Sequence, residues 1–240
     1  EDPICARAAV FGQKGVWAGV LQLDVLSVTR GLVRGIRNAA AALCGIPMEH
    51  LLVCATHNHA GPAVSRFWDA EPDSGYMATW AAQCAHAIAQ AHRDAVEAEL
   101  SFGRTFEWRV AANRRVVMRD GTVRTHGDFS DPKCLALEGP IDPEVGVLAA
   151  RAPEGQLLGM IVNYACHPTH HMDDDAFSAG FPGVLANRLA GSGCPNMVFL
   201  NGAFGNMHTI NPIGKSCNLE NAGTYLAEAA MTAAGQAAPL

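Results

Sequence analysis

Apolar and polar positions follow two different periods along the chain, and each period predicts one kind of element. Short apolar runs rich in β-branched residues have the length of strands; they cover residues 4–11, 16–23, 51–55, 100–111, 116–118, 145–150, 156–164 and 197–200. Longer segments have apolar residues at helical spacing; they cover residues 28–43, 74–97, 182–190 and 221–234. Strands that alternate with helices predict an α/β fold. Because several strands follow each other as hairpins, we expect a mixed sheet flanked by helices.

One stretch fits neither period. Residues 122–142 are polar and rich in Gly, Pro and Asp, so the sequence predicts a long connecting loop there, and long loops are often functional or mobile. The chain has no internal repeat and no composition typical of a linker. Residues 1–240 are therefore predicted to form a single domain.

Composition narrows the classes of function. Of the 240 residues, 49% are hydrophobic and 17% charged, which is enough to build a core and argues against disorder. The net charge of −6 and the scattered Lys and Arg residues predict no nucleic-acid binding. No apolar stretch is long enough for a transmembrane segment. The eight cysteines include no C-x-x-C pair, which argues against a cysteine zinc site and favours reduced thiols.

Two histidine clusters carry the strongest chemical signal. His57 and His59 follow the predicted strand 51–55, and His167 follows the predicted strand 156–164. Ligand sites in α/β folds collect at the carboxyl ends of strands. Imidazole is a common zinc ligand, and a catalytic zinc needs three protein ligands and one open position. A single histidine in a loop is more often only hydrogen-bonded, but three in two such contexts favour a metal site, and spacing alone makes it a three-histidine site.

Five motifs in order resemble one known family. They read ATHNHAGP at 55–62, NRR at 113–115, NYACHPT at 163–169, GFPG at 180–183 and FLNGAFGN at 199–206. Their order and spacing resemble those of the neutral/alkaline, non-lysosomal ceramidases. The resemblance implies a zinc-dependent amidohydrolase that cleaves the N-acyl bond of ceramide or a related N-acyl lipid. It also implies that residues 1–240 are an incomplete part of a larger ceramidase-type catalytic domain.

The resemblance assigns roles residue by residue. It implies that His57 and His167 bind Zn²⁺, and that His59 contacts the reacting group as a proton-transfer or oxyanion partner. It places Arg114 near the scissile bond, where a fixed cation steadies a carboxylate or an oxyanion; a surface cation between two strands is the alternative. The family's other two zinc ligands, a Glu and a Tyr, are expected beyond residue 240.

The chain departs from the family pattern at three positions. Gly180 and Asn206 stand where the family has aspartates, and His208 stands where ceramidases have a catalytic serine. Without that serine, direct attack by zinc-activated water is the simplest mechanism. We expect His208 to line the same cavity as the other three histidines, where it would exchange protons or form hydrogen bonds.

Two further features have competing interpretations. Asp24, at a strand end, is either a partner that holds a zinc-binding histidine or a simple turn residue. His170, His171 and the three aspartates at 173–175 form either a second metal site or, as we favour, a solvated acidic loop.

Three hypotheses of function remain open from the sequence. The first is the ceramidase-type zinc amidohydrolase. The second is a zinc hydrolase of a small soluble amide or ester, because no long apolar stripe for a lipid chain is evident. The third is a degenerate homologue that only binds metal or ligand, which the changes at Gly180, Asn206 and His208 would favour. The oligomeric state and the cellular location, whether secreted, periplasmic or cytoplasmic, are left open by the sequence.

Overall fold

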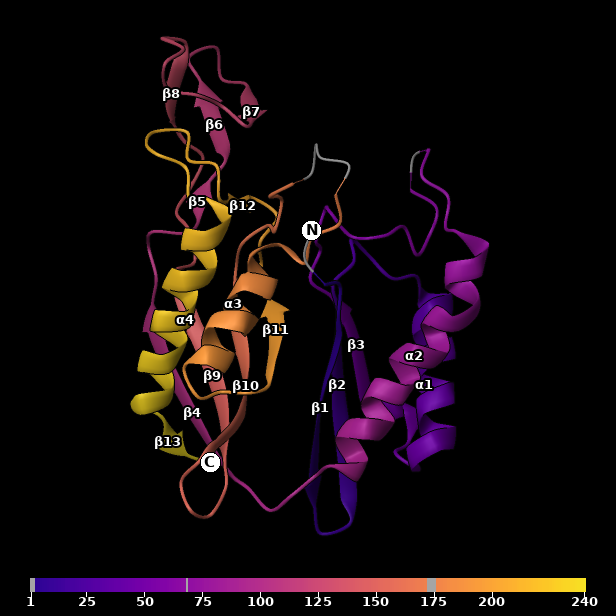
Figure 1. The fold of residues 1–240 in the computed structure, drawn as a ribbon. Helices are drawn as coiled ribbons and strands as arrows, with labels where there is room; N and C mark the ends of the chain where they lie inside the picture. Colours follow the sequence, from indigo (N-terminus) through magenta and orange to yellow (C-terminus); the bar gives the residue numbers. More distant parts are fainter. Residues whose placement is uncertain (1–2, 68, 172–175) are drawn as a thin grey trace.

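Two main sheets, each covered by a pair of helices, form most of the fold. This computed structural model describes residues 3–67, 69–171 and 176–240. Figure 1 shows α1 and α2 on the outer face of the first sheet, and α3 and α4 on the outer face of the second. Strands and helices alternate and the pairing is mixed, so the predicted α/β class is confirmed.

The first sheet has the order β1-β2-β3, with β1 at Ala6–Gln13, β2 at Val16–Leu23 and β3 at Leu51–Ala55. β1 and β2 form the predicted hairpin, whose turn uses Gly15 at φ 80°. β2 and β3 are parallel, and the connection contains α1 at Arg30–Cys44 and the 3₁₀ turn η1 at Met48–His50. The Thr29 hydroxyl caps the start of α1, and Gly45 ends it at φ 75°. Helix α2 at Ser74–Arg93 packs beside α1.

The second sheet has the order β11-β10-β9-β4-β13. Its strands are β4 at Glu99–Phe106, β9 at Glu144–Arg151, β10 at Leu157–Tyr164, β11 at Met197–Asn201 and β13 at Ala238–Pro239. Only β10 and β11 are parallel, and α3 at Gly180–Gly191 connects them. Helix α4 at Leu219–Gly235 lies directly on β4, because a Cβ on Gly103 would meet the Ala233 carbonyl oxygen at 2.0 Å.

The two halves meet along β2 and β11. The Gln22 side chain is fully buried there, and its Oε1 accepts a hydrogen bond from the backbone N–H of Phe199 at 3.1 Å. β11 is the edge strand of the second sheet, so this side chain satisfies a backbone N–H that no further strand pairs with. The two sheets are separate, and β11 of the second sheet contacts β1 and β2 of the first. In the view of Figure 1 the two sheets lie close together at their upper ends.

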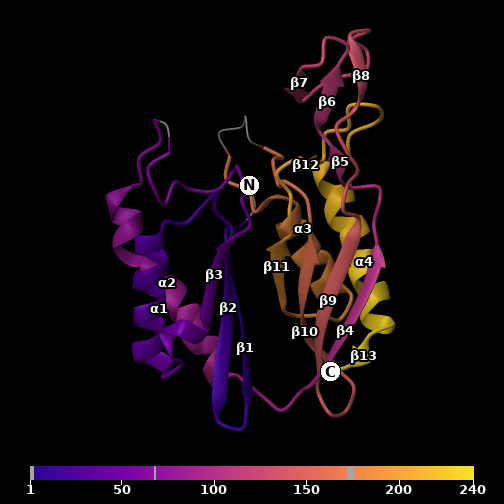
Figure 2. The ribbon, with the colours of Figure 1, turned by 180° about the vertical axis from the view of Figure 1, so that it is seen from behind.

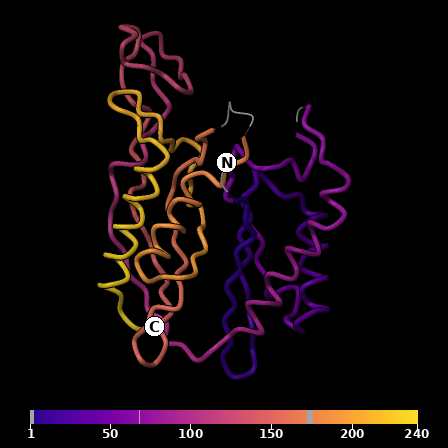
Figure 3. Tube along the Cα trace, viewed as in Figure 1, coloured from indigo at the N-terminus to yellow at the C-terminus, as the bar shows by residue number. Residues whose placement is uncertain are grey.

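A small sheet projects beyond the second half, as Figures 2 and 3 show from two sides. It contains β6 at Arg115–Met118, β7 at Val123–Thr125 and β8 at Cys134–Leu137, in the order β7-β6-β8. The loop predicted over 122–142 is therefore wrong in part. β6 matches the strand predicted over 116–118, but β7 and β8 were missed because they have only three or four residues. The buried core of this small sheet consists of Val116, Met118 and Cys134. At the base of this sheet, β5 at Ala112–Asn113 pairs with β12 at Met207–His208.

Other boundaries differ from the sequence prediction in small ways. The strand expected over 100–111 ends at Phe106, and the helix expected to reach residue 97 ends at Arg93. Within the described ranges, every helix is too short or too polar to cross a membrane.

Candidate functional site

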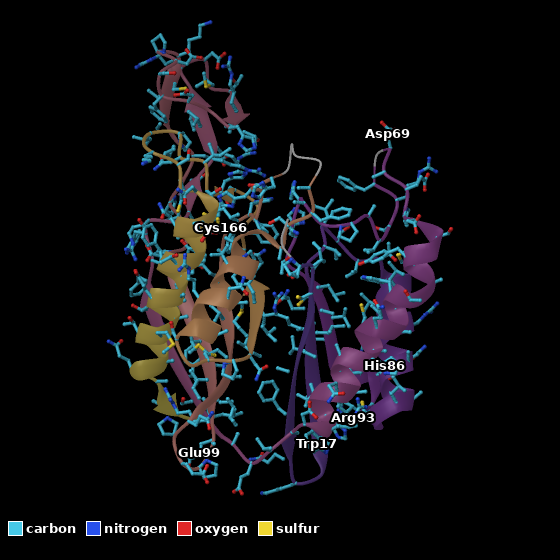
Figure 4. All side chains as sticks on the ribbon, in the orientation of Figure 1. Trp17, Asp69, His86, Arg93, Glu99 and Cys166 are labelled. Atoms are coloured by element: carbon cyan, nitrogen blue, oxygen red, sulfur yellow. The ribbon has the colours of Figure 1, made fainter. Side chains whose placement is uncertain are left out.

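The predicted histidine clusters lie at the carboxyl ends of two parallel strand pairs. His57 and His59 follow β3, and His167 follows β10, whose neighbour β11 leads into the loop at 202–206. These ends point to the same side of the molecule, above the junction of the two halves (Figure 1). Cys166 marks the end of β10 in Figure 4, and His86, on α2, lies in the other half. The topology therefore brings together residues that are 110 positions apart.

Hydrogen bonds join the loops to one another. The His59 backbone N–H donates to the Pro168 carbonyl at 3.2 Å, and the His167 N–H donates to the Met207 carbonyl at 3.0 Å. Asn58 is fully buried, and its amide donates to the Ser178 carbonyl while its Oδ1 accepts from the Ala60 N–H. The site is therefore built on fixed backbone rather than on free loops.

The three imidazoles converge as the metal hypothesis requires. One ring nitrogen from each of His57, His59 and His167 lies within 4.8 Å of those from the other two. The ring centroids of His57 and His167 are 5.1 Å apart, and those of His57 and His59 are 4.9 Å apart. Nitrogens that share one zinc ion lie roughly 3–4 Å apart, so the three nitrogens are close to the spacing that a shared zinc ion requires.

The hydrogen bonds of two rings fix which nitrogen is free to bind. His57 Nδ1 donates to the Leu26 carbonyl at 2.9 Å, and His167 Nδ1 donates to the carbonyls of Phe204 and Met207 at 2.9 and 3.1 Å. Because Nδ1 carries the proton in both rings, Nε2 keeps its lone pair. Metal-binding histidines usually have this arrangement, with the second nitrogen anchored to an acceptor.

His59 provides the most specific sign that a ligand belongs here. Its Nε2 is buried and has no hydrogen-bond partner among the described residues. A buried unpaired nitrogen costs on the order of 1–3 kcal/mol, so such atoms are rare unless something else satisfies them. The donor set therefore fits a metal ion that prefers nitrogen ligands, such as zinc.

Burial keeps these imidazoles neutral. Desolvation, with smaller contributions from His57 and Arg114, lowers the pKa of His59 and of His167 to about 4, and desolvation also lowers the pKa of His57. Neutral imidazole is the metal-binding form, so the three rings are ready to bind metal at neutral pH.

His57 has a strained backbone at φ 65°, in the left-handed region. For residues other than Gly this region is uncommon, and it often occurs at functional sites. The neighbouring turn needs Gly61, because a Cβ there would meet the Asp24 carbonyl oxygen at 2.5 Å. Close packing of this turn on the Asp24 strand end therefore turns His57 toward His167.

The structure places Arg114 beside the three histidines. Its charge contributes to lowering the pKa of each of them. Its Nη2 donates to the Gly205 carbonyl at 2.8 Å, and its backbone N–H donates to the Asn206 carbonyl at 2.9 Å. Arg114 is thus half-buried between β5 and the loop before β12, rather than a free surface cation.

His208 lies next to His167, with ring centroids 5.8 Å apart, but both its nitrogens are engaged. Its Nδ1 accepts from the Ile210 N–H at 3.0 Å, so Nε2 carries the proton and donates to the Thr169 hydroxyl at 2.7 Å. Burial, with smaller contributions from His126, Arg114 and other histidines, lowers its pKa to about 3. His208 therefore borders the site as a neutral ring whose arrangement favours hydrogen bonding over proton transfer.

Gly180 and Asn206 occupy positions set by the backbone. Gly180 begins α3 at φ 64°, a conformation that favours glycine, and its Cβ position would lie 3.3 Å from Asn58 Oδ1. The Asn206 carbonyl holds the backbone of Arg114.

Asp24 does not hold a histidine, which contradicts one of its two interpretations. Its carboxylate accepts from Arg7 Nη1 at 2.6 Å, from Gln22 Nε2 at 2.6 Å and from the Cys5 N–H at 3.0 Å. The acceptor that anchors His57 is instead the carbonyl of Leu26, two residues further on. A backbone acceptor leaves no trace in the sequence, which is why this contact was not predicted.

His170 is not a member of the three-histidine group. His170 Nε2 donates to the Cys217 carbonyl at 3.0 Å, and burial lowers its pKa. Its ring packs edge-on against Phe181. The aspartates at 173–175 lie outside the described residues, so the second-metal interpretation stays a hypothesis.

Two residues of the site were not singled out from the sequence. The Phe204 ring packs against His57 and His167, with centroids at 5.1 and 4.6 Å. The His126 ring lies 5.0 Å from that of His208, and its Nε2 is 3.1 Å from Arg114 Nη1. Phe204 is part of the FLNGAFGN motif, so the sequence could have identified it as a site residue. His126 belongs to the stretch that was predicted as a loop.

Comparison with known proteins identifies the fold. A ceramidase structure described as complexed with C2 matches with a TM-score of 0.77 and 17% identity, over 94% of this chain. The neutral ceramidase from Pseudomonas aeruginosa matches with a TM-score of 0.73 and 18% identity, over 93% of this chain. The chain spans 37% of the length of each. No family model matches, and no curated protein matches by sequence. The chain therefore has a ceramidase-type fold, as the motifs implied.

Proposed function

We propose that the protein is a zinc-dependent amidohydrolase that cleaves the N-acyl bond of ceramide or a related N-acyl lipid. The convergence of three neutral imidazoles, one with a buried unpaired nitrogen, is the observation that carries this proposal. The ceramidase-type fold supports the same class of hydrolase.

In this proposal His57 and His167 hold the metal through Nε2, because their Nδ1 atoms are anchored to backbone carbonyls. Zinc supplies a Lewis acid that polarises a carbonyl and lowers the pKa of water to about 7. Phe204 covers the two rings on one side and limits the access of bulk water.

His59 and Arg114 contribute the remaining chemistry. A neutral His59 with a free Nε2 either completes the metal site or accepts a proton at that atom. The Arg114 guanidinium, fixed by Gly205, stabilises the negative charge that develops on the acyl oxygen during hydrolysis, and later the carboxylate product. His208 keeps its proton on Nε2 and donates it in a hydrogen bond to Thr169. We therefore assign His208 a supporting role, and not the catalytic role of the serine that it replaces.

Exposed apolar side chains support a lipid substrate. Phe177 is 57% exposed and precedes Ser178, whose N–H bonds the Ala60 carbonyl beside His59. Ile210 is 44% exposed and follows His208 by two positions. Such groups would contact an acyl chain near the histidines. A small soluble amide is the alternative substrate, and a protein that only binds metal is the alternative function.

The test is release of fatty acid by the full-length protein. Ceramide and a short N-acyl amide are compared, each with zinc and with a chelator, in wild type, His57→Ala and His167→Ala. His86→Ala, on the exposed face of α2, is the matched control. We expect zinc-dependent release that both site variants abolish and the control retains. Release from the short amide alone would contradict the lipid assignment, and no release from zinc-loaded wild type would favour the binding-only alternative.

A further inference from the structure

The projecting sheet carries His126 to the site. His126 follows β7 directly, in the turn that leads from β7 toward β8. Backbone bonds fix this turn, because the Gly127 N–H donates to the Arg114 carbonyl at 3.3 Å and the Phe129 N–H donates to the Pro212 carbonyl at 3.0 Å. The projecting sheet is therefore attached to Arg114 itself and to the loop that follows β12.

The conformation of His126 is unusual. Its φ of 59° lies in the left-handed region, where histidine is tolerated better than most residues other than glycine. His126 is exposed, and its ring meets that of His208 edge-on, with an interplanar angle of 88°. The fold thus accepts a costly backbone angle and places this ring between Arg114 and His208, a pattern that indicates a functional constraint.

The contact with Arg114 has a defined direction. A guanidinium only donates, so Arg114 Nη1 donates and His126 Nε2 accepts, over 3.1 Å. The His126 ring must be neutral to accept, and partial desolvation together with the Arg114 charge lowers its pKa. Arg114 is then held by His126 on one side and by the Gly205 carbonyl on the other.

Both of these partners of Arg114 are uncharged. Among the described residues, no carboxylate lies within ion-pair distance of its guanidinium, and its Nε is buried without a partner. The adjacent Arg115 is bound on two nitrogens by Glu138, so the two arginines differ in this respect. Neutral acceptors fix the geometry of Arg114 without cancelling its charge.

We propose that His126 is a positioning residue, which holds Arg114 toward the three-histidine site and leaves its positive charge free for an anionic group of the substrate or product. The inference rests on the proposed function, because that function supplies the carboxylate product. A carboxylate side chain in place of His126 would keep the hydrogen bond but neutralise the guanidinium. A neutral amide of the same size would keep both the hydrogen bond and the charge.

The matched pair His126→Gln and His126→Glu tests this directly, because the two side chains have equal size and bear the same backbone strain. The probe is octanoate, titrated into metal-free full-length protein and followed by NMR, with Arg114→Ala as reference. We expect His126→Gln to bind octanoate about as wild type does. His126→Glu and Arg114→Ala should lose affinity by about tenfold or more, as for a lost charge-assisted hydrogen bond.

Additional readouts separate positioning from folding and from the proposed function. Zinc stoichiometry should be unchanged in both His126 variants, because His126 is not part of the three-histidine group. In the Arg114→Ala background, His126→Glu should have no further effect on octanoate binding. Equal octanoate affinity in wild type and His126→Glu, or no octanoate binding by wild type, would overturn the inference. If octanoate follows the expected pattern but no amide is hydrolysed, the proposed function fails and the positioning role stands.

Discussion

Replacement of His59 by leucine should stabilise the metal-free protein and at the same time weaken zinc binding. His59 Nε2 is buried and unpaired, and such an atom costs roughly 1–3 kcal/mol. Leucine has a similar size and no polar atom to satisfy. We therefore expect the free energy of unfolding of the metal-free protein to rise by about 1 kcal/mol, which corresponds to a Tm increase of about 2–4 °C for a chain of this length.

His167→Leu is the matched comparison and should have the opposite effect. It removes the Nδ1–H that serves two carbonyls, those of Phe204 and Met207, and leaves these acceptors in a buried site. The expected loss is about 1–3 kcal/mol, or a Tm decrease of at least a few degrees. The two substitutions thus exchange the same side chains and differ only in whether the histidine is anchored.

Zinc should make wild type more stable than His59→Leu, the reverse of their order in the metal-free state. At a free concentration of about 100 times Kd, zinc adds about 2.7 kcal/mol to wild type, which raises Tm by roughly 5–11 °C. Both variants should lose most of this increase. Thermal unfolding of full-length protein with zinc and with a chelator measures all three effects. If His59→Leu lowers the Tm of the metal-free protein as much as His167→Leu does, the unpaired nitrogen is satisfied in solution and the reasoning is refuted.

Three further predictions concern the chain as a whole. The metal-free protein should lose stability as pH falls from about 6.5 to about 4. In this range unfolded histidines take up protons, while His59, His167 and His208 stay neutral in the folded protein. The free energy of unfolding should change by at most about 1.4 kcal/mol per pH unit for each ring, and by less for a partly exposed ring. Urea unfolding at several pH values measures it, and His208→Gln should flatten the dependence. Gly103→Ala should lower the free energy of unfolding by about 1–3 kcal/mol, because the new Cβ would meet the Ala233 carbonyl oxygen at 2.0 Å. Gly121→Ala is the control: this glycine lies in an open turn, so its substitution introduces backbone strain without a steric clash. Removal of zinc by a chelator should leave the far-ultraviolet circular dichroism unchanged, since the two main cores are apolar and lie below the site; loss of helix signal would contradict this.

The sequence alone predicted the longer elements and the place of the candidate site. Strands and helices of eight or more residues were predicted within a few positions, because burial of one face imposes a clear period on the sequence. The His57 and His167 motifs were recognisable because both follow buried strands, and parallel strands place such residues at one edge. The five motifs also implied the ceramidase-type fold, which the structural comparison confirms.

Only the tertiary structure decided how the side chains are connected. The carbonyls of Leu26 and Phe204 anchor the rings, yet a carbonyl is present at every position and carries no signal in the sequence. The left-handed angle of His126 and its contact with Arg114 arise in the turn after β7, a strand of three residues that is too short to show a period. The neutral state of His208 likewise follows from its burial and from its hydrogen bonds to Thr169 and Ile210. Residue types are local information, whereas protonation, anchoring and charge compensation depend on neighbours that only the folded chain brings together.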